Sequence, residues 1–175
     1  MPTYISRDLA QYLMSKNSEL PELEILNAFP YPIHIYDAKG TSAMVNRAFL
    51  DTFELSSPDT IVGLYNLLSD AMIDLAGIRE YVERAFAGET IFIKDCKVSV
   101  KYIRKNHNIK RTDQKTMYQD ITSFPLLDSK GRVKFVVVMM ITQRLYNEKS
   151  EINRAKEYIQ NHCEEKFSLK KVASA

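Results

Sequence analysis

Hydrophobic residues recur every three or four positions in four stretches of the chain, and this spacing predicts helices. The stretches are residues 4–14, 21–28 and 78–86, with a further one that begins after Asn46. Asn46 suits a helix N-cap because its side chain can accept a hydrogen bond from the first turn. Residues 56–76 are less regular, and Pro58 and Gly63 allow only short helical pieces there.

Runs of β-branched and aromatic residues predict five strands. They cover Ile33–Tyr36, Ser42–Val45, Ile91–Ile103, Lys115–Leu126 and Arg132–Thr142. Asp-x-x-Gly turns at 37–40 and 128–131 join neighbouring strands as hairpins. Because helices are grouped between the second and third strands, the order predicts an α+β fold with an antiparallel sheet. The continuous apolar run Phe135–Ile141 is typical of a central strand that is covered on both faces.

Composition narrows the class of protein. The 175 residues are 45% hydrophobic and 26% charged, which is ordinary for one folded domain with an appended segment. The formal net charge of +2 gives no strong electrostatic case for binding nucleic acid or an anionic membrane. Two cysteines, Cys96 and Cys163, are too few for a Cys-rich zinc site and favour a reducing compartment. With no apolar run of membrane-spanning length and no signal peptide, we expect a cytoplasmic protein without membrane contact.

The composition changes after Thr142. Residues 143–164 are charged, contain no Gly or Pro, and carry Leu145, Ile152 and Ile159 at heptad spacing, which predicts a helix. The expected division of the chain is an N-terminal helix (1–20), a core domain (21–142), a linker helix (143–151) and a C-terminal helical unit (152–175).

A series of short motifs lies in order along residues 22–142. They are Leu23-x-x-Leu26, Phe29-Pro30-x-Pro32-Ile33-x-Ile35-x-Asp37-x-x-Gly40, Asn46-Arg47-Ala48-Phe49 and Phe53. Together they resemble a PAS domain. The resemblance implies a five-stranded antiparallel sheet with helices on one face, and an interior that is either a sensory pocket or a filled core.

Residues 152–175 resemble the start of the DNA-binding region of AraC-type transcription regulators. The matching residues are Ile152, Ala155, Tyr158-Ile159, His162, Ser168-Leu169 and Val172-Ala173. The resemblance implies the sensory region of a regulator whose groove-binding helix would follow Ala175. The chain as given would then end inside the first DNA-binding unit and would not bind DNA specifically.

Neither haem nor flavin is expected. Haem needs an axial ligand, and none of His34, His107 and His162 lies on the helix 78–86 or the stretch before it, where haem-binding PAS domains place theirs. Flavin photochemistry of the LOV type needs a reactive cysteine on a helix, whereas Cys96 falls on a predicted strand. No partner can be named for His34, so we interpret it as a structural histidine.

The sequence gives little evidence for catalysis or for a basic binding surface. The sequence has no phosphate-binding loop, no Gly-x-Ser-x-Gly and no His-Glu-x-x-His, so we predict that it is not an enzyme and holds no metal. The basic interval 97–115 favours a solvated hairpin over an anion-binding patch.

The candidate pocket consists of aromatic and aliphatic residues of the PAS-like part. They are Phe49, Phe53, Leu67, Met72, Ile78, Val82, Phe86, Tyr118, Phe124, Val137 and Met139. Five tyrosines could orient a small-molecule ligand, but their number prevents a ranking: Tyr36, Tyr65, Tyr81, Tyr102 and Tyr118. The apolar stripe of the first helix has no obvious place in the core and predicts a homodimer contact through Ile5, Leu9, Tyr12 and Leu13.

Three functions are compatible with these patterns. The first is a regulator in which a small molecule or a partner binds the PAS-like domain and biases the linker helix, and so DNA binding by the full-length protein. The second is a ligand-free module for dimerisation or docking. The third is an input domain that is joined to a different output.

Overall fold

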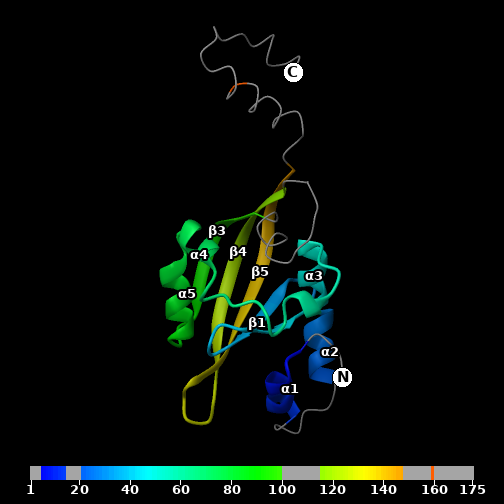
Figure 1. Cartoon of the computed structure of the whole chain (residues 1–175), viewed down its shortest axis with the longest axis vertical. Coiled ribbons are helices and arrows are strands. Elements are labelled where there is room, and N and C mark those ends of the chain that lie inside the picture. Colours follow the sequence, from blue (N-terminus) through cyan, green and yellow to red (C-terminus); the bar gives the residue numbers. More distant parts are fainter. Residues whose placement is uncertain (1–4, 15–20, 100–114, 148–158, 160–175) are drawn as a thin grey trace.

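The computed structural model of the chain describes residues 5–14, 21–99, 115–147 and 159. Among these residues, five strands form one antiparallel sheet in the spatial order β2-β1-β5-β4-β3 (Figure 1). The strands are β1 (Ile33–Asp37), β2 (Ser42–Val45), β3 (Ile91–Ser99), β4 (Lys115–Leu127) and β5 (Val133–Asn147). The predicted α+β fold with an antiparallel sheet is confirmed.

Helical elements cover both faces of this sheet. They are α1 (Arg7–Met14), α2 (Pro21–Ala28), α3 (Arg47–Phe53), the 3₁₀ turn η1 (Pro58–Thr60), α4 (Ala71–Leu75) and α5 (Arg79–Phe86). We call the face that packs against α3 and α5 the inner face, and the opposite one the outer face. The larger core cluster lies on the inner face, and a smaller cluster lies on the outer face beneath α1.

Strand β5 lies between β1 and β4 and contributes to both clusters. Val136, Val138 and Met140 face inward, whereas Phe135 and Val137 face outward. Successive side chains of a strand point to opposite faces, so a strand that is buried on both sides needs apolar residues at every position. The predicted central strand is therefore confirmed.

The first helix packs within its own chain. Leu9 is 1% exposed in the outer cluster, and Ile5 packs against the same cluster and pairs with Met44 at the edge of β2. The prediction that Leu9 forms a dimer contact is therefore wrong, because the apolar outer face of β1, β2 and β5 takes up its side chain. Ile5 is only partly buried, and its dimer contact stays a prediction. The side chains of Tyr12 and Leu13 lie outside what the structure describes, and homodimerisation itself stays a prediction.

Strand β5 is longer than its sequence indicates. It continues to Asn147 because its last residues pair with the first residues of β4, as in Tyr118 with Arg144. The prediction of a linker helix from residue 143 is therefore wrong for residues 143–147. Leu145, which fitted a heptad, lies on this strand and is 53% exposed.

Several predicted features lie outside the described residues. They are the end of the third strand beyond Ser99, most of the basic interval 97–115, and, apart from the helical residue Ile159, the remainder of the linker and the AraC-like unit.

Asn46 joins three parts of the fold through one fully buried side chain. Its Oδ1 accepts hydrogen bonds from the backbone N–H groups of Ile33, 2.9 Å away, and Phe49, 3.0 Å away. Its Nδ2 donates to the carbonyl groups of Phe29 and Tyr31, at 3.2 and 2.9 Å. The side chain therefore caps α3, as predicted, and also fixes the start of β1 and the loop before it.

Replacing Asn46 should destabilise the fold strongly. Asn46→Ala removes four hydrogen bonds and leaves buried backbone groups unpaired, so we expect the free energy of unfolding to fall by about 2–4 kcal/mol. Urea denaturation measures this change. Asn27→Ala is the matched control, because Asn27 accepts one exposed bond from Arg47 and should cost less than about 1 kcal/mol. Equal losses in the two variants would contradict the role given to Asn46.

Candidate ligand-binding site

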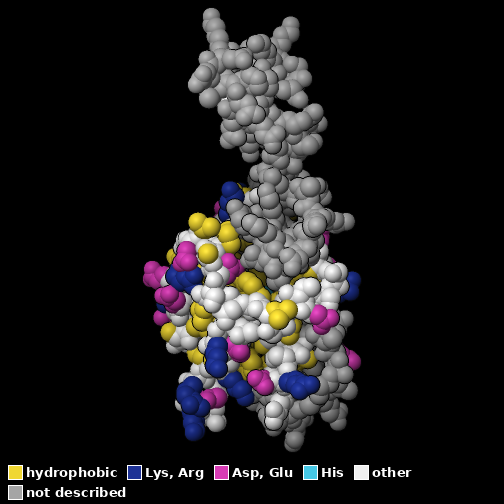
Figure 2. Space-filling model, viewed as in Figure 1, with side chains coloured by type: hydrophobic (Ala, Val, Ile, Leu, Met, Phe, Trp, Pro, Cys, Tyr) yellow, Lys and Arg dark blue, Asp and Glu magenta, His cyan; other side chains and the backbone are white. Residues whose placement is uncertain are grey.

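A cavity of about 180 Å³ lies between the inner face of the sheet and the helices. Its described lining comes from β1, β3, β4 and β5 on one side, and from α3 and residues 61–86, with α4 and α5, on the other. We call residues 66–86 the helical wall. Figure 2 shows hydrophobic side chains at the surface above α4, where Leu75 is 75% exposed.

Seven of the eleven predicted pocket residues line this cavity. They are Phe49, Phe53, Leu67, Met72, Ile78, Val82 and Phe86. All seven come from the helical side of the cavity, and on the helices the 3.6-residue period marks the buried face. Of the five tyrosines considered as ligand contacts, Tyr36, Tyr65 and Tyr81 are also in the lining, and Tyr102 lies outside the described residues.

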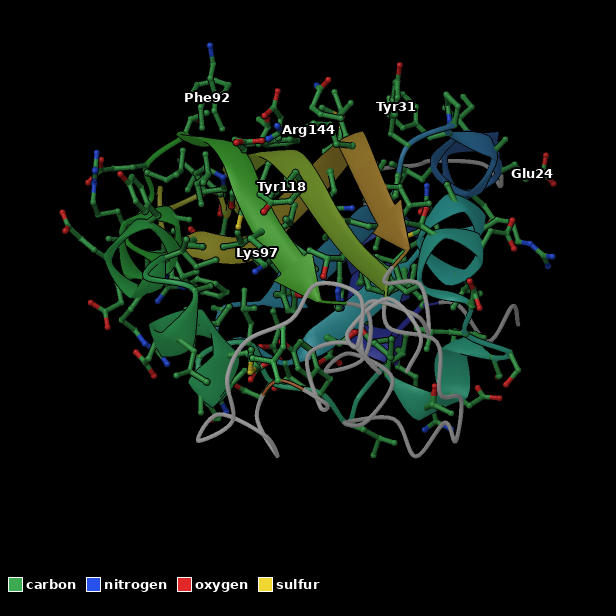
Figure 3. The ribbon with its side chains drawn as sticks, turned by 90° about the horizontal axis from the view of Figure 1, so that it is seen from above. Glu24, Tyr31, Phe92, Lys97, Tyr118 and Arg144 are labelled. Atoms are coloured by element: carbon green, nitrogen blue, oxygen red, sulfur yellow. The ribbon has the colours of Figure 1, made fainter. Side chains whose placement is uncertain are left out.

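The other four predicted pocket residues do not line the cavity, and the structure corrects them. Val137 and Met139 belong to the outer side of β5, and Phe124, which pairs with Val137, is on the outer side of β4. Tyr118 stacks against the guanidinium of Arg144, 4.6 Å from the ring centre, and Figure 3 shows the two side by side. The residues of β4 and β5 that line the cavity lie at the alternate positions, whose side chains point to the inner face. They are Gln119, Ile121 and Ser123 on β4, and Val138 and Met140 on β5. A continuously apolar strand carries no alternation, so its sequence does not show which residues face inward.

An aromatic polar cluster occupies one end of the cavity. His34, 2% exposed, has Nε2 2.8 Å from Ser42 Oγ and Nδ1 2.8 Å from the Tyr36 hydroxyl. Its ring stacks on Tyr36 with centres 4.0 Å apart and meets Phe49 edge-on at 4.8 Å. The structure thus supplies the partners of His34 that the sequence could not name.

The tyrosines at this end are neutral. Burial raises the pKa of Tyr36 well above its ordinary value, and the negative charge of Asp70 adds to the rise. Burial also raises the pKa of Tyr65, whose hydroxyl donates to Asp70 Oδ2 at 2.6 Å. Each phenol therefore keeps its proton at neutral pH.

Two polar side chains of β4 were missed by the sequence analysis. Gln119, fully buried, and Ser123, 8% exposed, both line the cavity. Gln119 Nε2 donates to Thr142 Oγ1 at 3.0 Å, but Gln119 Oε1 and Ser123 Oγ have no hydrogen-bond partner among the described residues. The available signal was their spacing. Gln119 and Ser123 alternate with the apolar Met117 and Ile121 at every second position, so all four side chains point to the same face of the strand.

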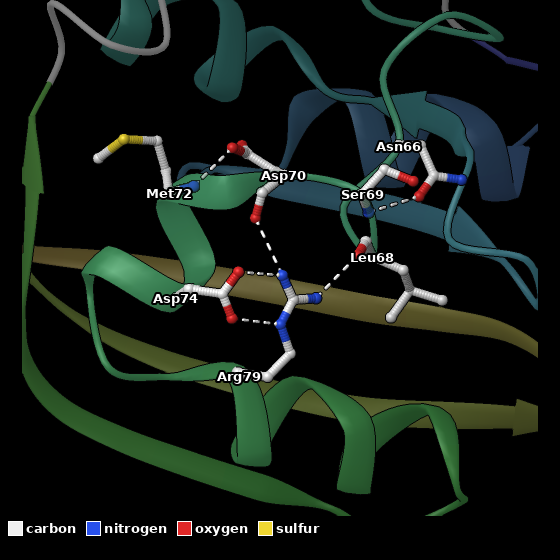
Figure 4. A network of polar contacts seen from close by, with 7 residues as sticks. All are labelled: Asn66, Leu68, Ser69, Asp70, Met72, Asp74 and Arg79. Atoms are coloured by element: carbon white, nitrogen blue, oxygen red, sulfur yellow. Dashed lines mark hydrogen bonds and ion pairs between the residues drawn. The ribbon is translucent and has the colours of Figure 1, made fainter.

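Arg79 holds the helical wall together (Figure 4). Its guanidinium donates to both carboxylate oxygens of Asp74, at 2.7 and 2.8 Å, and to the carbonyl oxygens of Leu68 and Asp70, at 2.7 and 3.2 Å. These contacts tie the start of α5 to α4 and to the loop before it. The hydrogen bond from Arg79 lowers the pKa of Asp74, so the pair stays ionised.

The loop that precedes α4 is also fixed against the first hairpin turn. Asn66 Nδ2 donates to the carbonyl oxygen of Lys39 at 2.9 Å, and Asn66 Oδ1 accepts from the N–H of Ser69. Gly40 has a φ of +84°, and a Cβ there would lie 2.7 Å from Leu68 Cγ. The turn thus needs glycine for its conformation and for the close approach of the helical wall.

Comparison with known proteins shows the fold. Neither a family model nor a curated protein matches this sequence. Among solved structures, a variant of RsLOV matches with a TM-score of 0.52 and 11% identity, covering 90% of this chain and 86% of that one. The PAS domain of Bordetella pertussis BvgS matches with a TM-score of 0.48 and 20% identity, over 81% and 98% of the two chains. The PAS domain of nitrogen regulation protein NR(II) from Vibrio parahaemolyticus has a TM-score of 0.44, 18% identity, and coverage of 71% and 99%.

The five-stranded antiparallel sheet with its helices is the α+β fold that the PAS resemblance implies. In the part of the chain that the structure describes, no helix is long and apolar enough to cross a membrane.

The role of Arg79 in the wall can be tested by hydrogen exchange. Lysine keeps the charge but cannot make the forked contacts of arginine, so Arg79→Lys should speed exchange of the α4 amides several-fold. Arg84→Lys is the matched control on the same helix, because Arg84 pairs only with Glu89 among the contacts found for its side chain in the described residues. Exchange of α4 that is the same in both variants would show that Arg79 does not hold the wall.

Proposed function

We propose that this chain is the sensory region of a signalling regulator and that its PAS-like domain binds a small molecule in the inner cavity. The observation that carries the proposal is the 180 Å³ cavity, whose mostly apolar lining includes buried polar atoms without a described partner. Binding sites for small molecules combine an apolar enclosure with a few placed polar groups.

The cavity volume favours this function over a ligand-free dimerisation or docking module. Protein interiors are packed densely and contain few voids larger than a water molecule. An engineered cavity of about 150 Å³ is large enough to bind benzene. A domain that only docked would have no reason to leave a larger space unfilled, because empty volume lowers stability.

The expected mechanism is a shift between conformations. Gln119, in the cavity lining, donates to Thr142 of β5, and β5 continues to Asn147 and so towards the C-terminal segment. A ligand that binds one arrangement of β4, β5 and the helical wall more tightly would raise the population of that arrangement. The shift would change the state of an output domain joined to β5.

We further propose that the output is DNA binding of the AraC type. The support is the resemblance of residues 152–175 that is described above. A cytoplasmic homodimer is the form in which such a regulator would act, since paired half-sites on DNA require two-fold symmetry.

If the cavity binds a small molecule, the purified protein should release that molecule when it is denatured. The protein should carry a bound small molecule in native mass spectrometry, or bind one from a metabolite extract with a rise in melting temperature. Ala85→Leu adds bulk to a buried position of the lining and should abolish both effects. Ala87→Leu, at the exposed end of α5, should retain them. A folded wild-type protein with no ligand by either method would contradict the sensory function and support the docking module.

The DNA-binding output predicts the sequence that follows Ala175. We expect the reading frame to continue with the remainder of one helix–turn–helix unit and a complete second one, with basic residues on the groove-facing helices. A continuation of another kind, such as a kinase domain, would refute the DNA-binding output and leave the ligand-binding proposal untouched.

A further inference from the structure

We infer that the ligand of this cavity is an uncharged molecule of one or two rings that donates a hydrogen bond to Gln119 Oε1. The inference rests on the proposed function, because it concerns what the same cavity selects. It follows from the charges, the unpaired polar atoms and the aromatic surface of the lining.

The lining offers few partners for a charged ligand. Among the described lining residues, the charged side chains are Asp70 and Lys97. Each oxygen of the Asp70 carboxylate already accepts one hydrogen bond: Oδ1 accepts from the N–H of Met72 at 2.9 Å, and Oδ2 accepts from Tyr65. Lys97 is exposed at the rim. A buried charge without a partner is costly, so this cavity selects against ions.

Gln119 presents a fixed acceptor. Its side chain is fully buried, and Nε2 donates to Thr142 Oγ1, whose own hydroxyl donates to Met117 Sδ. Gln119 Oε1 is thereby left without a partner among the described residues, and a buried acceptor in this state destabilises the empty protein. A ligand N–H or O–H group would satisfy it.

Ser123 is a second polar group on the same side of β4. It lies four residues from Gln119, about 13 Å along the strand, and its hydroxyl also has no partner among the described residues. A hydroxyl can donate or accept, so Ser123 imposes no further choice of chemical group. The specific requirement is therefore the donor that meets Gln119.

The size and walls of the cavity favour rings. Its volume of about 180 Å³ exceeds that of the engineered cavity, about 150 Å³, that accepts benzene. The rings of Tyr36, Phe49 and Phe86 all belong to the lining, and aromatic surfaces pack favourably against flat partners.

Indole and benzofuran test the donor requirement directly. The two probes have the same shape, but only indole carries an N–H group. Calorimetric titration of the wild-type protein should show indole binding about tenfold more tightly, the ratio expected when a buried acceptor gains its partner. Gln119→Met keeps the length of the side chain and removes the acceptor, so it should bind both probes equally. Thr122→Ala, on the outer side of the same strand, is the matched control and should keep the preference.

The outcomes separate this inference from the proposed function. Equal binding of the two probes to the wild-type protein, or a preference that persists in Gln119→Met, would overturn the donor requirement while the cavity remains a binding site. The wild-type comparison decides even if Gln119→Met does not fold. An ionised molecule released from the purified protein would also overturn the inference and support the sensor. If neither probe binds and no molecule is released, both proposals fail.

Discussion

Strand β5 has apolar side chains on both of its faces, and the whole molecule is arranged to keep both faces from water. On the outer side, Leu9 of α1 covers the surface next to Phe135 and Val137. On the inner side, α3, the 3₁₀ region and α5 cover Val136 and Val138. Because burial of apolar area is the main favourable term in folding, neither layer is dispensable. The N-terminal helix is thus part of the core.

The inner layer differs from the outer layer in how closely it can approach the sheet. Its short helices are held by polar contacts at their ends, with Asn46 at the start of α3 and Arg79 at the start of α5. These contacts fix the positions of the helices without filling the space between them, and the cavity is the result. This arrangement places the cavity beside β5, the strand that leads towards the C-terminal segment.

The sequence was informative about the helical side of the pocket and misleading about the strands. Phe49, Val82 and Phe86 were identified because the helical period marks a buried face. Val137 and Met139 were assigned to the pocket because a doubly buried strand shows no alternation from which its inner face could be identified. Gln119 was overlooked because a polar residue in a strand normally indicates the solvent side, and here it indicates a buried acceptor.

By itself, the sequence determined the class of fold, the order of elements, the hairpin turns and the cap at Asn46. These features depend on local periodicity and on the conformational preferences of single residues, which one sequence records. The tertiary structure decided where Ile5 and Leu9 pack, how far β5 continues, which side of each strand meets the cavity, and that Gln119 Oε1 has no described partner. Those outcomes depend on pairing and packing between residues that are distant along the chain, and such contacts leave no periodic signal in the sequence.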